Sequence, residues 1–348
     1  MRIRFLVPGN VRHGSGGNKY NAKLAEHLTA LGVTVETVTV DGDWPVGSRA
    51  DRIRFGEALD GGTTVIADGL VASGAPEEVA GAAGKGTQVW ILSHMALADH
   101  PGLEAKALAG ATGIICPSAH AAAGLEARYG SLNAVIAIPG ADSADIAAGS
   151  EPPHIVAVAA LLPNKSQLEL VETFAGMQDL EWSAALIGSE NADTSYAAEV
   201  RAAVERYGLE NRISVTGELT GKPLEDQWHK ADLSVLLSRS ESFGMVVTES
   251  LAHGVPAIVR QGTGAVEALG TKEAGAALDL ATGEEPAKTL RRWLTDQGLQ
   301  QSWRNNALQA RQDLQGWDTT AATVLKALQS PPNQGSRTSP AGEWRRNP

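Results

Sequence analysis

Short apolar runs alternate along the chain with longer stretches of helical periodicity. Between the runs lie segments such as 19–31, in which apolar residues recur near helical spacing until Gly32 ends the pattern. The strand-like runs of the first part lie at 3–7, 33–40, 64–67, 89–92, 113–116 and 135–139. Strands that alternate with helices predict βαβ units and a parallel sheet.

The pattern is interrupted at residues 140–153, which are rich in Ala, Ser, Gly and Pro and show no strong period. A second α/β series follows, with strand-like runs at 155–158, 183–187, 213–215, 233–237 and 256–259 and the last helices over about 286–328. The length of 348 residues also favours two domains. We therefore predict doubly wound, Rossmann-like domains at 1–145 and 151–312 that face one another across a ligand-binding cleft. The Pro-rich residues 330–348 are predicted to be a disordered tail.

Composition narrows the class of protein. The chain has 29 basic and 40 acidic residues, a net charge of −11, which argues against binding to nucleic acid or attraction to anionic membrane. No apolar run approaches the roughly 20 residues of a membrane span, so we expect no integral membrane association. Residues 1–9 indicate a buried strand and not a secretory signal. The single cysteine, Cys116, excludes an intrachain disulfide and a cysteine-rich metal site, so we expect a cytoplasmic protein.

The segment 237–256 carries the strongest chemical signal. A loop with Glu241 follows a buried strand, and a helix is expected to begin near Gly244. Free N–H groups at such a helix start, around Phe243 to Val246, form an anion site. Glu249 falls about one and a half turns into the helix at ~1.5 Å per residue, so both carboxylates can accept hydrogen bonds from the hydroxyls of one ligand. On spacing alone, two solvated glutamates are the simpler interpretation.

Glu241 and Glu249 form an E-x7-E arrangement within ESFGMVVTESLAHGVP, and this segment resembles glycosyltransferase family 4, whose members are retaining enzymes with the GT-B fold. The resemblance covers about residues 1–328 and is strongest in the second half. It implies an α/β GT-B architecture, with a helix at 313–328 that crosses back to the first domain. It also implies that Glu249 holds the donor ribose. The residues expected around the donor hexose and phosphate are Glu241, Phe243, Gly244, Met245 and Val246.

Residues 158–166, VAALLPNKS, resemble the family segment V-G-R-L-x-P-x-K-G. Lys165 is expected between a strand and a helix, where its ammonium can pair with a diphosphate; a solvated loop lysine is the simpler alternative. Ala160 stands where the family has arginine, so one charge-assisted hydrogen bond of ~1.5–3 kcal/mol is missing. Either another cation supplies that charge or donor binding is weak. The candidate replacements are Arg12, Arg239 and Arg260.

The first half contributes a glycine-rich loop at 8–18, PGNVRHGSGGN, where backbone can approach a ligand closely. Its spacing is not that of a dinucleotide fingerprint, which disfavours a nicotinamide dehydrogenase. The resemblance implies that Gly16 and Gly17 close over the diphosphate. It also implies that His94, which follows the run at 89–92, hydrogen-bonds a sugar hydroxyl; a structural role is an equal alternative.

Two further positions carry local expectations. Leu219 lies in a segment that resembles the loop framing the nucleobase, and core packing of Leu219 and Leu224 is an equal alternative. Ser118, after the run at 113–116, is expected to cap the following helix.

Together these observations predict a retaining glycosyltransferase that moves a hexose-type sugar from a nucleoside-diphosphate sugar to a soluble acceptor. We expect no metal and no other cofactor, because the family usually works without metal and the sequence holds no metal motif. The residues assigned to catalysis are Glu241, Lys165 and His94. The residues assigned to donor binding are Gly16, Gly17, Glu249, Phe243, Gly244, Met245, Val246, Leu219 and Arg239.

Three alternatives stay open: a sugar-nucleotide hydrolase of the same fold, an epimerase of the same fold, and a non-catalytic sugar-nucleotide-binding protein. The sequence does not identify the base or sugar of the donor, the acceptor or the oligomeric state.

Overall fold

The computed structural model describes residues 1–11 and 14–330. Arg12 and residues 331–348 of the tail predicted at 330–348 lie outside the described residues. The chain forms two compact units. The first consists of Met1–Asn10, Asn21–Ile138 and the chain from Thr320 onward, and the second of Val11–Tyr20 and Pro139–Thr319. Each unit is built on one parallel sheet.

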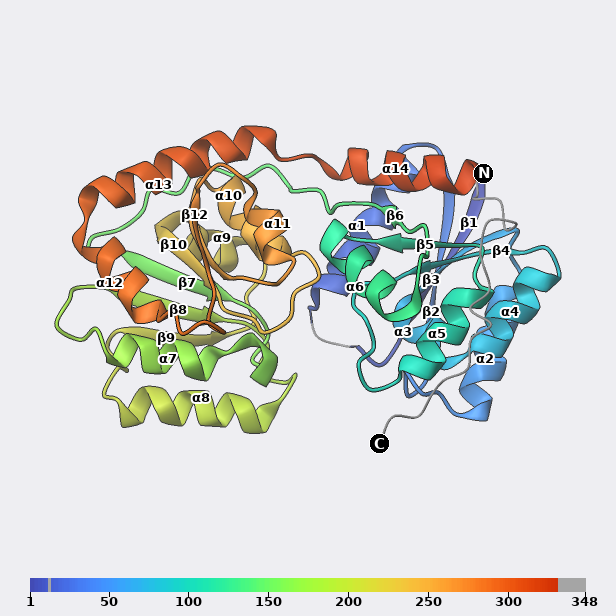
Figure 1. Cartoon of the computed structure of the whole chain (residues 1–348), viewed down its shortest axis with the longest axis horizontal. Helices are drawn as coiled ribbons and strands as arrows, with labels where there is room; N and C mark the ends of the chain where they lie inside the picture. The colour runs from blue at the N-terminus through green and yellow to red at the C-terminus, as the bar shows by residue number, and fades with distance from the viewer. Residues whose placement is uncertain (12–13, 331–348) are drawn as a thin grey trace. The chain divides into compact units, whose positions relative to one another are not determined.

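The first unit holds a six-stranded sheet in the order β2-β1-β3-β4-β5-β6. Its strands are β1 (Arg2–Pro8), β2 (Thr34–Val40), β3 (Thr64–Asp68), β4 (Gln88–Leu92), β5 (Gly113–Cys116) and β6 (Val135–Ile136). The helices that lie wholly within its residues are α2 (Arg49–Leu59), α3 (Gly69–Gly74), α4 (Pro76–Gly84), α5 (Pro101–Gly110) and α6 (Ala119–Tyr129). The first turn of α1 (Gly16–Ala30) and of α14 (Trp317–Gln329) belongs to the second unit, and the rest of each helix belongs to the first. Helix α4 packs against both α2 and α5 (Figure 1). Strands β3 and β5 are buried throughout, which explains the apolar sequence of β5 and of the middle of β3, whose end residues Thr64 and Asp68 are polar.

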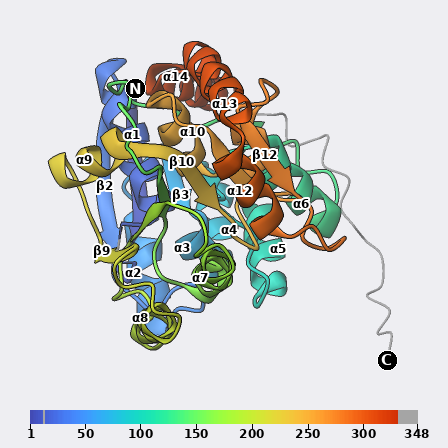
Figure 2. The ribbon, with the colours of Figure 1, turned by 90° about the vertical axis from the view of Figure 1, so that its left-hand side faces the viewer.

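The second unit holds a sheet in the order β12-β11-β10-β7-β8-β9. Its strands are β7 (His154–Val158), β8 (Ser183–Ile187), β9 (Ile213–Gly217), β10 (Ala231–Leu236), β11 (Ala257–Arg260) and β12 (Gly275–Leu278). Its helices are η1 (Pro163–Lys165), α7 (Gln167–Ala175), α8 (Thr194–Arg206), α9 (Lys222–Lys230), α10 (Met245–Ala252), α11 (Ala265–Leu269), α12 (Pro286–Thr295), α13 (Gln297–Ala310) and η2 (Arg311–Asp313). Helices α7 and α8 lie on one side of this sheet, and α9 and α10 lie on the other (Figures 1 and 2).

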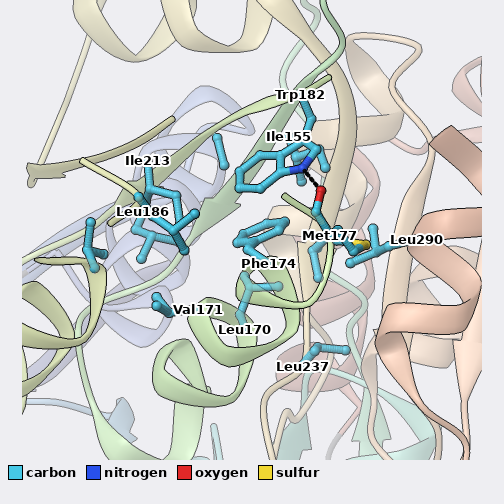
Figure 3. Packing of buried hydrophobic residues seen from close by; sticks show 14 of the residues in the cluster. Ile155, Leu170, Val171, Phe174, Met177, Trp182, Leu186, Ile213, Leu237 and Leu290 are labelled. Carbon is cyan, nitrogen blue, oxygen red and sulfur yellow. Dashed lines mark hydrogen bonds between the residues drawn. The ribbon is translucent and has the colours of Figure 1, made fainter. Parts of the chain in front are cut away.

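The core of the second unit fixes the strand that leads into the lysine-bearing loop. Phe174 of α7 stacks on Trp182 with 4.8 Å between ring centroids, and the Trp182 indole Nε1 donates to the Met177 carbonyl at 2.8 Å (Figure 3). Both rings and Ile155 of β7 belong to one buried cluster. Truncation of such a buried aromatic costs about 3–5 kcal/mol, so this cluster holds α7 firmly against β7.

The predicted strands are all present, with two differences at the sheet edges. The run predicted at 135–139 pairs only at Val135 and Ile136, because the neighbouring strand β5 ends at Cys116. Strand β12 was not predicted, because its sequence GAAL has no β-branched residue. A Cβ on Gly275 would lie 1.8 Å from the Ala257 carbonyl oxygen, so a glycine is required where β12 approaches β11.

Two helices differ from prediction at their starts. Helix α1 begins at Gly16, not at residue 19, because the Ser15 hydroxyl accepts a hydrogen bond from the Asn18 amide at 3.1 Å and caps the helix one turn earlier. The last helix begins at Trp317 and not at 313, because extended backbone at Leu314 ends the turn of η2. The predicted cap of α6 is confirmed, since the Ser118 hydroxyl accepts from the Ala121 amide at 2.8 Å.

Over the two described stretches of chain, no helix combines the length and the apolar character needed to cross a lipid bilayer.

Candidate active site

The carboxyl edge of the second sheet brings together three cationic side chains. Strands β11, β10 and β7 are neighbours in the sheet and run parallel, so their carboxyl ends meet at one edge. Lys165 follows β7, Arg239 follows β10, and Arg260 is the last residue of β11. The Arg239 amide donates to the Asn164 carbonyl at 2.7 Å, which ties the loops after β7 and β10 to each other.

Lys165 and Glu241, predicted separately, form one ion pair. The Lys165 ammonium donates to Oε1 of Glu241 at 2.6 Å, and the two side chains are only 21% and 15% exposed. Lys165 is the last residue of the turn η1, which places its side chain beside Glu241. Ser166 then adopts a left-handed conformation (φ 59°, ψ 32°) before α7 begins. The structure therefore confirms that Lys165 lies between a strand and a helix.

The start of α10 is placed as the sequence predicted. Gly244 precedes the helix at φ 89°, and no side chain among the described residues caps it. The first amides, at Met245 and Val246, therefore have no intrahelical acceptor and suit an anion. A Cβ on Gly264 would lie 2.1 Å from the Ser242 carbonyl oxygen, so a glycine there allows the loop after β11 to pack on this turn.

Glu249 lies on α10 in the second unit, and its carboxylate has a partner that sequence reasoning missed. The Lys19 ammonium, from the segment Val11–Tyr20 of the same unit, donates to Oε1 of Glu249 at 2.5 Å. In the same segment the Gly14 amide donates to Oε1 of Glu218 at 3.1 Å. A cavity of about 80 Å³, lined in part by Lys19 and Glu249, adjoins this carboxylate.

Gly16 and Gly17 lie in the first turn of α1 and not in the loop where they were predicted. The two glycines are helical because the Ser15 hydroxyl caps α1 before Gly16. A Cβ on Gly16 would meet nothing within 4 Å, so the space around it is open.

Arg239 and Arg260 share a carboxylate that was not among the predicted residues. Nη2 of Arg239 donates to Oε1 of Glu169 at 2.5 Å, and Nη2 of Arg260 donates to Oε2 at 3.2 Å. The hydrogen bond with Glu169 raises the pKa of Arg239. The two guanidinium groups differ in exposure, since the Arg239 side chain is 61% exposed and the Arg260 side chain 18%.

His94 lies in the first unit, beyond the end of β4, within a hydrogen-bonded group of three side chains. The Asn21 carboxamide donates from Nδ2 to Oδ2 of the buried Asp68 at 2.8 Å. The carboxamide oxygen of Asn21 therefore faces Nε2 of His94, 2.8 Å away, and that nitrogen must donate. Burial lowers the pKa of His94, and the nearby Asp68 carboxylate opposes this shift only in part. Burial therefore favours the neutral imidazole, and the contact with Asn21 fits a proton on Nε2.

Leu219 and Leu224 pack against a buried apolar cluster of the second unit that includes Trp228 and Val255. This packing agrees with the core-packing alternative, and both side chains remain partly exposed.

Residues 141–310 match the family model described as glycosyl transferases group 1. Mannosylfructose-phosphate synthase of Agrobacterium fabrum is 33% identical over 117 residues, which cover 32% of this chain and 26% of that protein. D-inositol 3-phosphate glycosyltransferase of Jonesia denitrificans is 30% identical over 141 residues, 40% of this chain and 33% of that protein. The matched segments thus span about a quarter to a third of these relatives.

Solved structures are similar over nearly the whole chain. Sucrose-phosphate synthase from Thermosynechococcus elongatus has a TM-score of 0.76 at 18% identity, covering 94% of this chain and 98% of that one. The Anabaena protein HepE in complex with UDP and glucose has a TM-score of 0.75 at 16% identity, covering 95% and 100%. The predicted GT-B fold, with two Rossmann-like units, is confirmed.

Proposed function

We propose that the protein transfers a hexose-type sugar from a nucleoside-diphosphate sugar to an acceptor, because residues 141–310 match the family model of glycosyl transferases group 1. The transfer retains the configuration of the sugar and uses no metal. One observation carries the proposal. Lys165 and Glu241 form an ion pair at the carboxyl ends of β7 and β10, just before the start of α10, which no side chain among the described residues caps. A cation beside free helix amides is an arrangement suited to a diphosphate.

The diphosphate would be held by three elements. Lys165 supplies a positive charge, and the first amides of α10, with Phe243 and Gly244 preceding them, supply hydrogen-bond donors. The amides at the start of α1, from Gly16 and Gly17, add donors on the first helix. Groups that stabilise the charge of the departing diphosphate act chiefly in the transition state, which is how they accelerate transfer.

The remaining donor contacts are assigned by side-chain chemistry. Glu249 accepts hydrogen bonds from the ribose hydroxyls, Glu241 contacts the transferred hexose, and Leu219 borders the base. His94, as the Nε2–H tautomer, hydrogen-bonds a sugar hydroxyl. Arg239 adds positive charge at the same sheet edge. The departing phosphate takes the acceptor proton on the face from which it leaves, so no side chain acts as a nucleophile.

A hydrolytic acid and base pair is a poorer account of the two glutamates. Glycosidic hydrolysis needs one carboxyl group to donate a proton and a second to act across the bond. Glu241 accepts a hydrogen bond from Lys165, and Glu249 accepts one from Lys19, so neither is arranged to donate a proton.

The acceptor is proposed to be a small soluble molecule. The first half has no basic amphipathic helix that would favour a lipid-linked acceptor, and the names of two relatives refer to phosphorylated small molecules, a mannosylfructose phosphate and D-inositol 3-phosphate. We place the reaction in the cytoplasm, on the basis of the single cysteine.

The test is direct assay of the purified chain with UDP-, GDP- and ADP-sugars and a panel of small acceptors. We expect release of the nucleoside diphosphate together with an α-linked product. Glu249→Ala should lose at least tenfold in donor affinity, because two ribose hydroxyls lose their acceptor. Glu199→Ala, which removes an exposed glutamate of α8 in the same unit, is the matched control. Unchanged donor affinity in Glu249→Ala would overturn the ribose assignment.

A second function is favoured by one observation, the alanine at position 160 where the family has arginine. A non-catalytic sugar-nucleotide-binding protein would bind a donor tightly and show no turnover with any acceptor. Release of nucleoside diphosphate without acceptor would instead indicate a hydrolase, and interconversion of the sugar on the retained nucleotide would indicate an epimerase.

A further inference from the structure

We propose that Arg260 is the phosphate-binding cation that replaces the arginine missing at position 160, and that Arg239 keeps the charge of Arg260 available by neutralising Glu169. The inference rests on the proposed function, because it assigns a further residue to the same diphosphate. Its basis is the arrangement of charge along the carboxyl edge of the second sheet.

The strand order places Arg260 at the same carboxyl edge of the second sheet as Lys165. Ala160 follows β7, and β10 separates β7 from β11, at whose end Arg260 lies. The loop that begins after Arg260 reaches Gly264, whose amide donates to the Glu241 carbonyl at 2.7 Å. The backbone from Arg260 to Gly264 is therefore joined directly to the loop that also carries the partner of Lys165.

Among the described residues, the ion pairs at this edge join three cations to two carboxylates. Lys165 pairs with Glu241, and Arg239 and Arg260 share Glu169, one at each carboxylate oxygen. One negative charge is thus shared by two guanidinium groups. Of the two, Arg260 is the less exposed, so its charge is the less screened by water and the one that a ligand at this edge would neutralise. A dianionic or trianionic diphosphate supplies the missing negative charge.

Burial distinguishes Arg260 from an ordinary surface arginine. Its side chain is 18% exposed, and its Nε atom is buried with no hydrogen-bond partner among the described residues. A guanidinium held in this way loses little conformational entropy when it binds a phosphate. An exposed arginine such as Arg239 would lose more.

The experiment compares ligands that differ only in phosphate. Wild-type protein is first screened by calorimetry against UDP, GDP and ADP. The nucleoside diphosphate that binds most tightly is then compared with the corresponding free nucleoside. Arg260→Gln should weaken diphosphate binding about ten- to a hundredfold and leave nucleoside binding unchanged, since one charge-assisted hydrogen bond is lost. Arg239→Gln should weaken diphosphate binding less. Arg291→Gln removes an arginine paired with Asp179 in the same unit and should change neither affinity.

A rescue variant separates phosphate binding from a structural role of Arg260. Ala160→Arg in the Arg260→Gln background should restore most of the lost diphosphate affinity, whereas a misfolded Arg260→Gln protein would not recover. Equal loss of nucleoside and diphosphate affinity, or unchanged diphosphate affinity, in Arg260→Gln would overturn the inference and leave the proposed function standing. Failure of the wild type to bind any of the three diphosphates would overturn both.

Discussion

Lys165 and Glu241 are 76 residues apart in sequence, yet the lysine ammonium donates to the glutamate carboxylate at 2.6 Å. Each follows one of two paired parallel strands, β7 and β10. The pair holds the lysine in place before any ligand is bound, and it holds the glutamate next to the start of α10. The same contact that stabilises the free protein thus prepares both groups for the proposed diphosphate and hexose.

Replacement of Lys165 by methionine should lower turnover about 10²–10³-fold, because the departing diphosphate loses a charge that stabilises it in the transition state. The measurement is the initial rate of nucleoside diphosphate release at saturating donor. Lys222→Met, which removes an exposed lysine paired with Asp226 in the same unit, should leave the rate unchanged. Wild-type turnover in Lys165→Met would contradict the catalytic assignment.

The ion pair should also be visible in stability. Lys165→Met leaves the part-buried Glu241 carboxylate without its cation, whereas Lys165→Met combined with Glu241→Gln leaves no unpaired charge. We expect a coupling free energy of about 1–2 kcal/mol between the two positions in urea unfolding of the four proteins. Additive effects of the two substitutions would show that the pair contributes nothing to folding.

Ser166→Gly should stabilise the second unit by about 0.5–1 kcal/mol. Serine is held at φ 59°, a left-handed conformation that costs a residue with a Cβ roughly 1–2 kcal/mol, and its buried hydroxyl has no partner among the described residues. The greater chain entropy of unfolded glycine, about 0.5–1 kcal/mol, offsets part of the gain. Thermal melting measures the change. Ser166→Ala keeps the backbone strain and removes the hydroxyl, so an equal rise in Tm for both variants would assign the effect to the hydroxyl.

The sequence predicted the parts of the fold that depend on local pattern. Strands rich in Val, Ile and Leu were located because they are buried on both faces, and Lys165, Glu241 and the start of α10 were located because each follows such a strand. Strand β12 was missed because its Gly and Ala residues carry no strand signal, and its pairing depends on a close approach to Ala257.

The partners within the site could not be predicted, because they come from distant segments. Glu169 is 70 residues from Arg239 and 91 from Arg260, and its position in the first turn of α7 reads as an ordinary helix-start acidic residue. Asn21 is 73 residues from His94. The sequence of its helix does not indicate that Asn21 is buried or that it donates to Asp68. Only the strand order of each sheet brings these groups together.

Gly264→Ala should weaken binding of the diphosphate while leaving the fold intact. The backbone of Gly264 has φ −62°, which any residue adopts, so the new methyl group is limited only by space. A Cβ would lie 2.1 Å from the Ser242 carbonyl oxygen and 2.7 Å from the Phe243 nitrogen, so the turn before α10 must move. We expect at least a tenfold loss of diphosphate affinity, equivalent to about 1.4 kcal/mol, by calorimetry. Gly124→Ala, at a helical position with open space, is the control and should bind normally.

The neutral His94 should make the protein less stable in mild acid. Its pKa in the folded state is lowered by burial below the ordinary value of 6.5, so the unfolded chain binds a proton more readily than the folded one. Stability is therefore complete above about pH 6.5 and falls as the pH drops from there toward the folded-state pKa. His94→Gln, which retains a donor to Asn21 and cannot titrate, should lose part of this dependence when Tm is followed from about pH 7.5 to about pH 5. His154 in the second unit also has a pKa lowered by burial, so His154→Gln should remove a separate part of the slope. An unchanged pH profile in His94→Gln would show that His94 has the same pKa in the folded and the unfolded chain, which would contradict the lowering of its pKa by burial.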